Sequence, residues 1–324
     1  MKKRLVLLAV SLGLVAILVY FSGPMEVANT VLRANPYYLM AALGLWFLGS
    51  VVRTLRWRYL LKKVDITVPF PSLWKYYVAG LFVANLSPAK TGEPARAALL
   101  KQLEDKSFSK SMSTIIVEKS TDLVLMSIIC LVGIYLIASP GGLLRWVYLA
   151  VMIYAALILS IMYVIFSGRK LEIILKKILG FLSFLPKVSV LNDRTEDFVE
   201  KLRSSMKLYR SKTTLAGAFL YTLAVTVISG ALLWVSLLAV NVQTSLAVAT
   251  VALVGTMLIS FLTMLPGSLG SGEVILVAFL VAFVGASRGD LTSAVLLRRV
   301  LESFMYIFVG AGIVATMSEK VLEL

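Results

Sequence analysis

Residues 85–93 read Asn-Leu-Ser-Pro-Ala-Lys-Thr-Gly-Glu, and residues 265–273 read Leu-Pro-Gly-Ser-Leu-Gly-Ser-Gly-Glu. Each stretch interrupts a long apolar run with proline and glycine and ends in a glutamate. A chain inside a bilayer cannot leave unpaired backbone groups facing lipid, so such breaks must line protein or a wet cavity. Two interruptions at corresponding positions of two halves are typical of a transport site. They predict two re-entrant helical hairpins.

The composition places the chain among membrane proteins. Hydrophobic residues make up 59% of the sequence and charged residues 15%, and the mean hydropathy is +0.91. An ordinary soluble domain carries about 25% charge. Runs of about 20 apolar residues, enough to cross a bilayer, recur along the chain. We therefore predict an all-α polytopic membrane protein, a single domain over residues 1–324, with about six full transmembrane helices plus two inverted re-entrant helical hairpins.

The apolar runs give the expected boundaries of these elements. The predicted spans are Leu5 to Phe21 (a retained first helix rather than a cleaved signal), Tyr37 to Val52, Ser111 to Ala138, Trp146 to Phe166, Thr214 to Val240 and Leu291 to Met317. The hairpins are expected at 74–100 and 245–285. A short polar connection with Glu26, Asn29 and Arg33 precedes the second span, and a basic and aromatic interfacial collar follows it, formed by Arg53, Arg56, Trp57, Arg58, Lys62 and Lys63.

The formal charge of +15 is explained by the loops. Most of the 32 basic residues flank spans on one side, and only Arg33, Arg145 and Arg288 fall in loops on the other. The positive-inside rule then predicts a multi-pass protein of the cell membrane with both termini cytoplasmic, and it makes nucleic-acid binding an unnecessary explanation. Residues 167–213 are the long polar stretch, expected to form a basic cytoplasmic amphipathic segment that links two weakly repeated halves.

Cysteine and histidine chemistry is nearly absent. Cys130 is the single cysteine and lies in an apolar run, and the chain contains no histidine. This excludes an intramolecular disulfide and a cysteine metal cluster, together with the commonest general base. The sequence also lacks a P-loop and a dinucleotide fingerprint, so we predict no metal, no cofactor and no catalytic residue.

Ionisable residues are grouped within apolar sequence, where they are costly and are functional candidates by default. Glu93 and Arg96 are three residues apart, so their side chains meet on a helix. Glu118 and Asp122, four apart, share one face. The second half contains a similar set of charges. Glu273 is followed by Arg298 and Glu302, which are four residues apart, and Arg299 lies next to Arg298.

These charges support two interpretations. The acids and arginines can neutralise one another and hold helices together. Alternatively, the arginines and the helix starts after the two breaks receive an anionic head group, because a helix start offers free N–H groups and a positive dipole end. The residues predicted to bind the substrate are Asn85, Pro88, Lys90, Gly92, Glu93, Arg96, Glu118, Asp122, Pro266, Gly267, Gly270, Gly272, Glu273, Arg298, Arg299 and Glu302.

On these residues the chain resembles the family containing the transmembrane region of lysylphosphatidylglycerol synthases, also called flippase-like domain proteins. The resemblance rests on Arg56-Trp57 with Leu60-Leu61, on Asn85, Pro88, Gly92-Glu93 and Arg96, on Glu118 and Asp122, and on the loop 266–273 with Arg299. It covers nearly the whole chain. Lys90 and Lys119 depart from the pattern, which has arginine at both positions, so bidentate phosphate contact is lost there.

The resemblance implies the lipid-translocating half of such synthases, since no aminoacyl-transferase domain follows within these 324 residues. The expected function is a lipid flippase-like transporter that moves an anionic phospholipid or a polyprenyl-phosphate-linked lipid between leaflets, without enzymatic turnover. The alternatives are a membrane-embedded enzyme of lipid-linked sugar or head-group transfer, with Glu118 and Asp122 as acid and base, and an accessory subunit of a separate transferase. The expected partners are an anionic membrane lipid and a separately encoded lipid-modifying transferase; an oligomer is compatible with the sequence.

Overall fold

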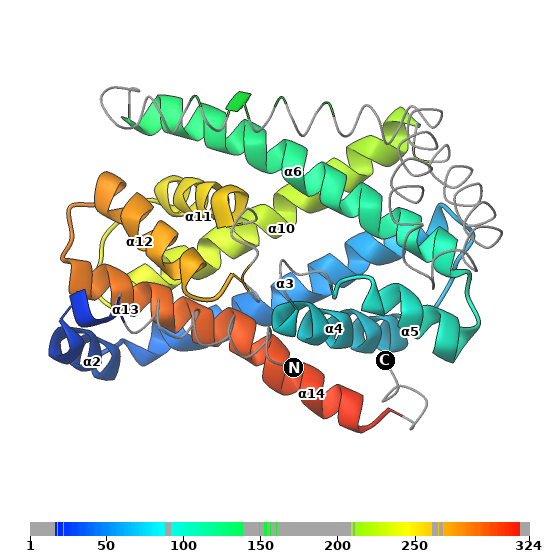
Figure 1. Ribbon diagram of the computed structural model, residues 1–324, viewed down its shortest axis with the longest axis horizontal. Coiled ribbons are helices and arrows are strands. Elements are labelled where there is room, and N and C mark those ends of the chain that lie inside the picture. Colours follow the sequence, from blue (N-terminus) through cyan, green and yellow to red (C-terminus); the bar gives the residue numbers. More distant parts are fainter. Residues whose placement is uncertain are drawn as a thin grey trace, which may run out of the picture.

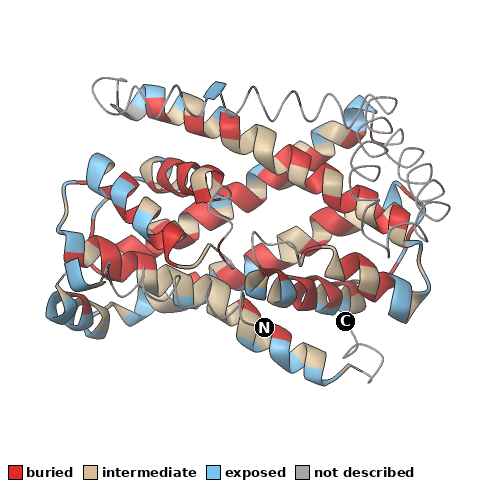
Figure 2. Ribbon diagram, viewed as in Figure 1, coloured by how far each residue is buried: buried red, intermediate tan, exposed pale blue. Residues whose placement is uncertain are grey.

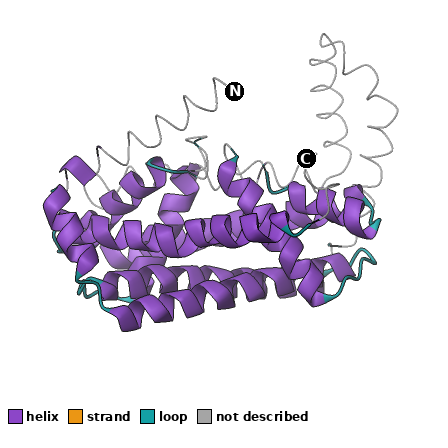
Figure 3. Cartoon of the chain, turned by 90° about the horizontal axis from the view of Figure 1, so that it is seen from below, coloured by secondary structure: helices purple, strands orange, loops and turns teal. Residues whose placement is uncertain are grey.

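A computed structural model describes residues 23–87, 92–138, 211–260 and 268–317, together with positions 17, 19–21, 149, 152, 153, 156, 160, 209 and 265. These parts of the chain are helical and contain no strand, which confirms the all-helical prediction (Figure 1 and Figure 3). The elements are α2 (Pro24–Leu32), α3 (Pro36–Lys62), α4 (Phe70–Leu86), α5 (Ala95–Glu104), α6 (Phe108–Ala138), α10 (Lys212–Ala239), α11 (Leu246–Ser260), α12 (Ser271–Phe283), α13 (Arg288–Arg299), the π-helical segment η3 (Val300–Phe304) and α14 (Met305–Ala315).

Helices α3 and α10 are long and apolar enough to cross a bilayer, with 27 and 28 residues. Helices α11 and α12 are apolar but shorter. The expected spans 5–21 and 146–166, and the expected amphipathic segment 167–213, lie almost entirely outside the described residues. The number of spans therefore stays a prediction.

The two long helices pack side by side and antiparallel through the centre of the molecule (Figure 1). The start of α3 meets the end of α10, where the Asn35 N–H donates to the Ala239 carbonyl at 2.8 Å. Small residues permit the close approach: a side chain at Gly49 would meet Ile228 at 3.3 Å, and one at Gly217 would meet the Tyr59 hydroxyl at 2.5 Å. Such contacts are the usual means of helix association in a bilayer.

The two sequence breaks each separate a pair of helices that pack on one another, α4 with α5 and α11 with α12. Helix α6 lies across α11, α10, α3 and α5, and α14 packs on α4 (Figure 1). The C-terminal helix expected at 291–317 is present as an uninterrupted succession of α13, η3 and α14. A π-helical turn inside a longer helix is uncommon and occurs frequently at functional sites.

Two boundary predictions were wrong. The expected polar connection around Glu26 is helix α2, because Pro24 sits in its first turn with Glu26, and both favour a helix start. The second span does not end at Val52, since α3 continues to Lys62. In the expected interfacial collar, Arg56 and Trp57 are buried, Arg53 and Arg58 are partly buried, and Lys62 and Lys63 at the end of the helix are exposed.

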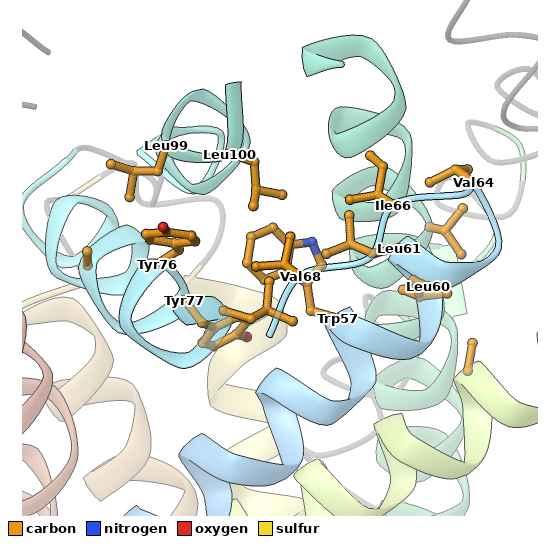
Figure 4. Close-up of a cluster of buried hydrophobic side chains, with 14 of the residues drawn as sticks. Trp57, Leu60, Leu61, Val64, Ile66, Val68, Tyr76, Tyr77, Leu99 and Leu100 are labelled. Atoms are coloured by element: carbon orange, nitrogen blue, oxygen red, sulfur yellow. The ribbon is translucent and has the colours of Figure 1, made fainter. Parts of the chain in front are cut away.

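The two largest apolar clusters of the described interior come mainly from different helices, one from α3, α4 and α5 and the other from α10 to α13. Figure 2 shows the buried residues along these helices. The first surrounds Trp57, which is fully buried between Tyr77 of α4 and the side chains of α5 (Figure 4). Its indole N–H donates to the Thr114 hydroxyl of α6 at 2.9 Å. The second joins α10 to α11, α12 and α13. Charged side chains lie in the space between the two clusters.

Candidate functional site

A cavity of about 230 Å³ lies between the two apolar clusters. Both sequence breaks reach it, the first through Asn85 and Glu93 and the second through Ser268, Gly272 and Glu273. Pockets that enclose a drug-sized ligand measure roughly 300–1,000 Å³. This cavity therefore has room for a head group and not for a whole lipid.

One wall of the cavity is apolar and another is charged. Helix α11 supplies much of the apolar wall, with Leu253, Val254, Met257 and Leu258. The charged lining residues are Arg53, Arg56, Glu93, Glu118, Lys119, Asp122, Glu273, Arg298, Arg299 and Glu302. We divide these residues, together with Arg96, into two groups, which we call the first and the second cluster. Ion pairs connect all members of the first cluster, whereas the second combines two neighbouring ion-paired sets.

The first cluster joins the opening half of the chain. Its members are Arg56, Arg96, Lys119, Glu93, Glu118 and Asp122. Glu118 binds two arginines, with Arg56 Nη2 at 2.6 Å from Oε1 and Arg96 Nη2 at 2.9 Å from Oε2. Asp122 also accepts from Arg56, and Lys119 Nζ lies 2.6 Å from Glu93 Oε1.

Arg96 is held by more than charge. Its guanidinium lies 5.0 Å from the ring centre of Trp57 and 4.9 Å from that of Tyr77, within cation–π range. Glycine at position 80 makes room for it, because a Cβ there would lie 2.9 Å from the Arg96 Cβ. Glu93, three residues before it, is a more distant partner at 4.0 Å. Arg96 packs behind the cavity wall rather than in it.

The second cluster joins α3 to the C-terminal half. Its members are Arg53, Arg298, Arg299, Glu273 and Glu302. Glu302, in the π-helical segment η3, accepts from Arg298 and lies 3.4 Å from Arg53 Nη2. Arg299 Nε is 3.2 Å from Glu273 Oε1.

Arg53 is fixed in place by two hydroxyl groups as well as by Glu302. It donates to Ser229 of α10 at 2.8 Å and to the Tyr306 hydroxyl at 3.3 Å. Residues 53 and 56 are one helical turn apart on α3 and serve different clusters. One helix thus carries an arginine of each charged group.

The start of α12 is capped by its own side chain. Gly270 has φ 83°, a conformation that favours glycine. Its backbone N–H donates to Glu273 Oε2 at 2.6 Å, so this carboxylate satisfies a donor that the helix start would otherwise offer to an anion. At the first break, the Gly92 N–H donates to the Ser87 hydroxyl at 2.7 Å.

The clusters differ in charge balance. Among the described residues the first has three cations and three carboxylates, whereas the second has three cations and two carboxylates. Burial does not separate them, because Glu118 and Arg56 are 1% and 2% exposed but Lys119 of the same cluster is 39% exposed. Arg298 and Arg299 of the second cluster are 11% and 15% exposed. Among the described residues the first cluster is therefore neutral, and the second carries one surplus positive charge.

The structure brings most of the sequence-predicted site residues to one place. Those bordering the cavity are Asn85, Glu93, Glu118, Asp122, Gly272, Glu273, Arg298, Arg299 and Glu302. Gly92 and Gly270 shape the two loops beside it. Pro88, Lys90, Pro266 and Gly267 lie outside the described residues.

Sequence reasoning missed three cationic members of these clusters. It assigned Arg53 and Arg56 to an interfacial collar, which was wrong, and it left Lys119 out of the site. The available signal was the three-residue spacing of Arg53 and Arg56, which places both on one side of a helix, together with the polar Ser50 and Thr54 nearby in an otherwise apolar helix.

Comparison with known sequences gives consistent matches over most of the chain. The profile of the family described as Lysylphosphatidylglycerol synthase TM region matches residues 5–310. A UPF0104 membrane protein of Methanothermobacter thermautotrophicus is 23% identical over 338 residues, covering 99% of this chain and 98% of the relative. The UPF0104 membrane protein of Methanocaldococcus jannaschii is 23% identical, with coverage of 87% and 85%. That of Pyrococcus horikoshii is 21% identical, with coverage of 99% and 98%.

Proposed function

Since the chain belongs to the lysylphosphatidylglycerol synthase transmembrane-region family of membrane proteins, we propose that it moves an anionic lipid between bilayer leaflets. The lipid is a phospholipid or a polyprenyl-phosphate-linked lipid, and its head group enters the cavity between the two clusters. The transport itself requires no bond to be made or broken.

The observation that carries this proposal is the surplus cation of the second cluster. Arginine at membrane depth is costly unless it is paired or functional. Arg53 and Arg298 share Glu302, whereas Arg299 pairs with Glu273, and an anionic group can take the place of a carboxylate at an arginine fork. The apolar residues of α11 that complete the cavity suit the part of the lipid next to its head group.

In the same proposal, the first cluster has a structural role. Arg56 binds both Glu118 and Asp122, so these two carboxylates are engaged as counter-charges. An acid–base pair for head-group transfer would instead need carboxylates directed at a substrate. The transfer-enzyme alternative therefore has less support than transport.

We also propose the topology that the sequence predicted, with six spans, both termini cytoplasmic, and the two helix pairs as re-entrant hairpins of opposite orientation. Support comes from the charge bias of the loops and from the meeting of both breaks at one cavity. Single cysteines at Gly92 and Ser268, in a Cys130→Ser background, should react with membrane-impermeant maleimide from opposite sides. Labelling of both from one side would contradict the inverted arrangement.

Reconstitution tests the transport step. The purified protein in phosphatidylcholine vesicles should speed exchange of a fluorescent phosphatidylglycerol between leaflets, measured by quenching of the outer leaflet. Arg298→Gln and Arg299→Gln should slow exchange by about tenfold or more, since a hydrogen-bonded charged partner contributes about 1.5–3 kcal/mol. Lysine at either position should support only part of the wild-type exchange rate, because its point charge replaces the planar fork of arginine.

The matched control is Arg288→Gln, which removes an exposed arginine at the start of the same helix, α13. It should leave exchange unchanged. If no phospholipid or polyprenyl-phosphate-linked lipid exchanges faster than in protein-free vesicles, the proposal is wrong and an accessory role becomes the better explanation.

A further inference from the structure

We infer that the second cluster selects lipids whose head group carries one net negative charge, that is, phosphodiesters rather than phosphomonoesters or zwitterions. This rests on the proposed transport function and adds a substrate class to it. The residues that determine the selectivity are the charged members of the second cluster. Arg53, which the sequence had placed in the interfacial collar, is one of them.

The charge count leads to this class directly. Within the described residues, the two clusters together contain six cations and five carboxylates, a surplus of one positive charge; ten of these groups line the cavity and Arg96 lies behind its wall. The first cluster, with Arg96 included, has three cations and three carboxylates, so the surplus resides in the second cluster. One monoanion makes the second cluster neutral. A phosphomonoester would leave it negative, and a zwitterion would leave it positive.

The geometry favours a diester as well. Glu302 is held by Arg298 and by Arg53 at 3.4 Å, so a phosphate that enters here competes with this carboxylate for the same two forks. A diester presents two charged oxygens, the same number as the carboxylate it replaces, and both match a fork. Its two ester groups can lie against the apolar wall formed by Leu253, Met257 and Leu258 of α11.

Lipid selectivity under charge-changing substitutions tests the inference. Vesicles of phosphatidylcholine at pH 8 would each contain one tracer lipid: phosphatidylglycerol (a diester), phosphatidic acid (a monoester) or labelled phosphatidylcholine (a zwitterion). Wild-type protein should exchange the diester at least about tenfold faster than either other lipid, because a like-charge mismatch in a buried site costs several kcal/mol and each 1.4 kcal/mol is tenfold.

The variants should move this preference in opposite directions. Glu302→Gln leaves three cations and one carboxylate and should shift preference toward phosphatidic acid. Arg298→Gln leaves two of each and should shift it toward phosphatidylcholine. Glu273→Gln and Arg299→Gln change the charge of the second cluster by the same amounts as Glu302→Gln and Arg298→Gln, respectively, but at the other ion pair. They can therefore replace either of those variants if it does not fold. Arg288→Gln should leave the wild-type order unchanged.

Soluble anions test whether the cavity recognises the head group alone, without the rest of the lipid. Dimethyl phosphate, a monoanionic diester, should inhibit exchange more than inorganic phosphate does at equal concentration. Equal exchange of all three lipids, or an order that none of the four cavity variants alters, would overturn the inference while leaving transport intact. Absence of any exchange would overturn transport itself. Binding of dimethyl phosphate without exchange of any lipid would overturn both.

Discussion

The first cluster makes a quantitative prediction about stability. Glu118 is 1% exposed and is shared by Arg56 and Arg96. Glu118→Gln leaves three cations facing two carboxylates in the interior. Removing one partner of a buried ion pair typically destabilises a protein by about 3–5 kcal/mol. Because Arg56 keeps Asp122, we expect the lower end of this range, about 3 kcal/mol.

A second substitution should recover part of this loss. Arg96→Met removes one cation and restores the balance to two against two. The methionine can remain between the rings of Trp57 and Tyr77, where sulfur–aromatic contacts are favourable. The double variant should therefore be more stable than the sum of the single effects predicts, by about 2 kcal/mol, within the range of coupled neighbours.

The assay is equilibrium unfolding in detergent micelles, followed by circular dichroism and by modification of Cys130. The matched control combines Glu118→Gln with Arg298→Gln, which belong to different clusters and should add within about 0.5 kcal/mol. The division into two clusters would be refuted if the Glu118 and Arg96 effects were additive. It would also be refuted if Arg298→Gln recovered as much stability as Arg96→Met.

Three further outcomes are expected. Gly80→Ala should destabilise the protein by about 1–3 kcal/mol in the same unfolding assay, since its Cβ would press on Arg96. The control is Gly44→Ala, which has open space around it and should not destabilise the protein. Equal losses of stability would contradict the close approach of α4 and α5. Trp57→Phe should cost about 1 kcal/mol through loss of the bond to Thr114, a cost that should vanish in a Thr114→Val background. Cys130, which is fully buried, should resist maleimide until denaturant unfolds the protein, as followed by mass spectrometry, and rapid labelling of native protein would contradict the packing of α6 against α11.

Much of the fold could be predicted from the sequence because apolar runs and breaks are local signals. Helix α6 was expected at 111–138 and is Phe108–Ala138, and α10 was expected at 214–240 and is Lys212–Ala239. The pairs on either side of both breaks were also anticipated. The π-helical segment η3 was not, because its sequence Val-Leu-Glu-Ser-Phe is compatible with an ordinary α-helix.

The charged site was only partly predictable, for a different reason. Pairs three or four residues apart, such as Arg298 and Glu302, follow from helix geometry alone. The partners of Arg53 and Arg56 are at positions 302, 118 and 122, far away in the sequence. The three-residue spacing of these arginines and the nearby Ser50 and Thr54 place them on one side of a helix, but this local signal does not identify their partners. Their burial depends on the packing of α3 against α6 and α10, which only the three-dimensional structure provides.

A polar cavity inside a membrane protein is also a route through which ions can leak. A cation passing about 4 Å from one unit of net positive charge meets about 4 kcal/mol of repulsion at an effective dielectric constant of 20, which lowers its rate of passage roughly a thousandfold. Fixed positive charge is a known means of excluding protons and other cations from membrane pores. In the proposed transport site, the surplus positive charge of the second cluster should therefore oppose the leakage of cations while an anionic group enters.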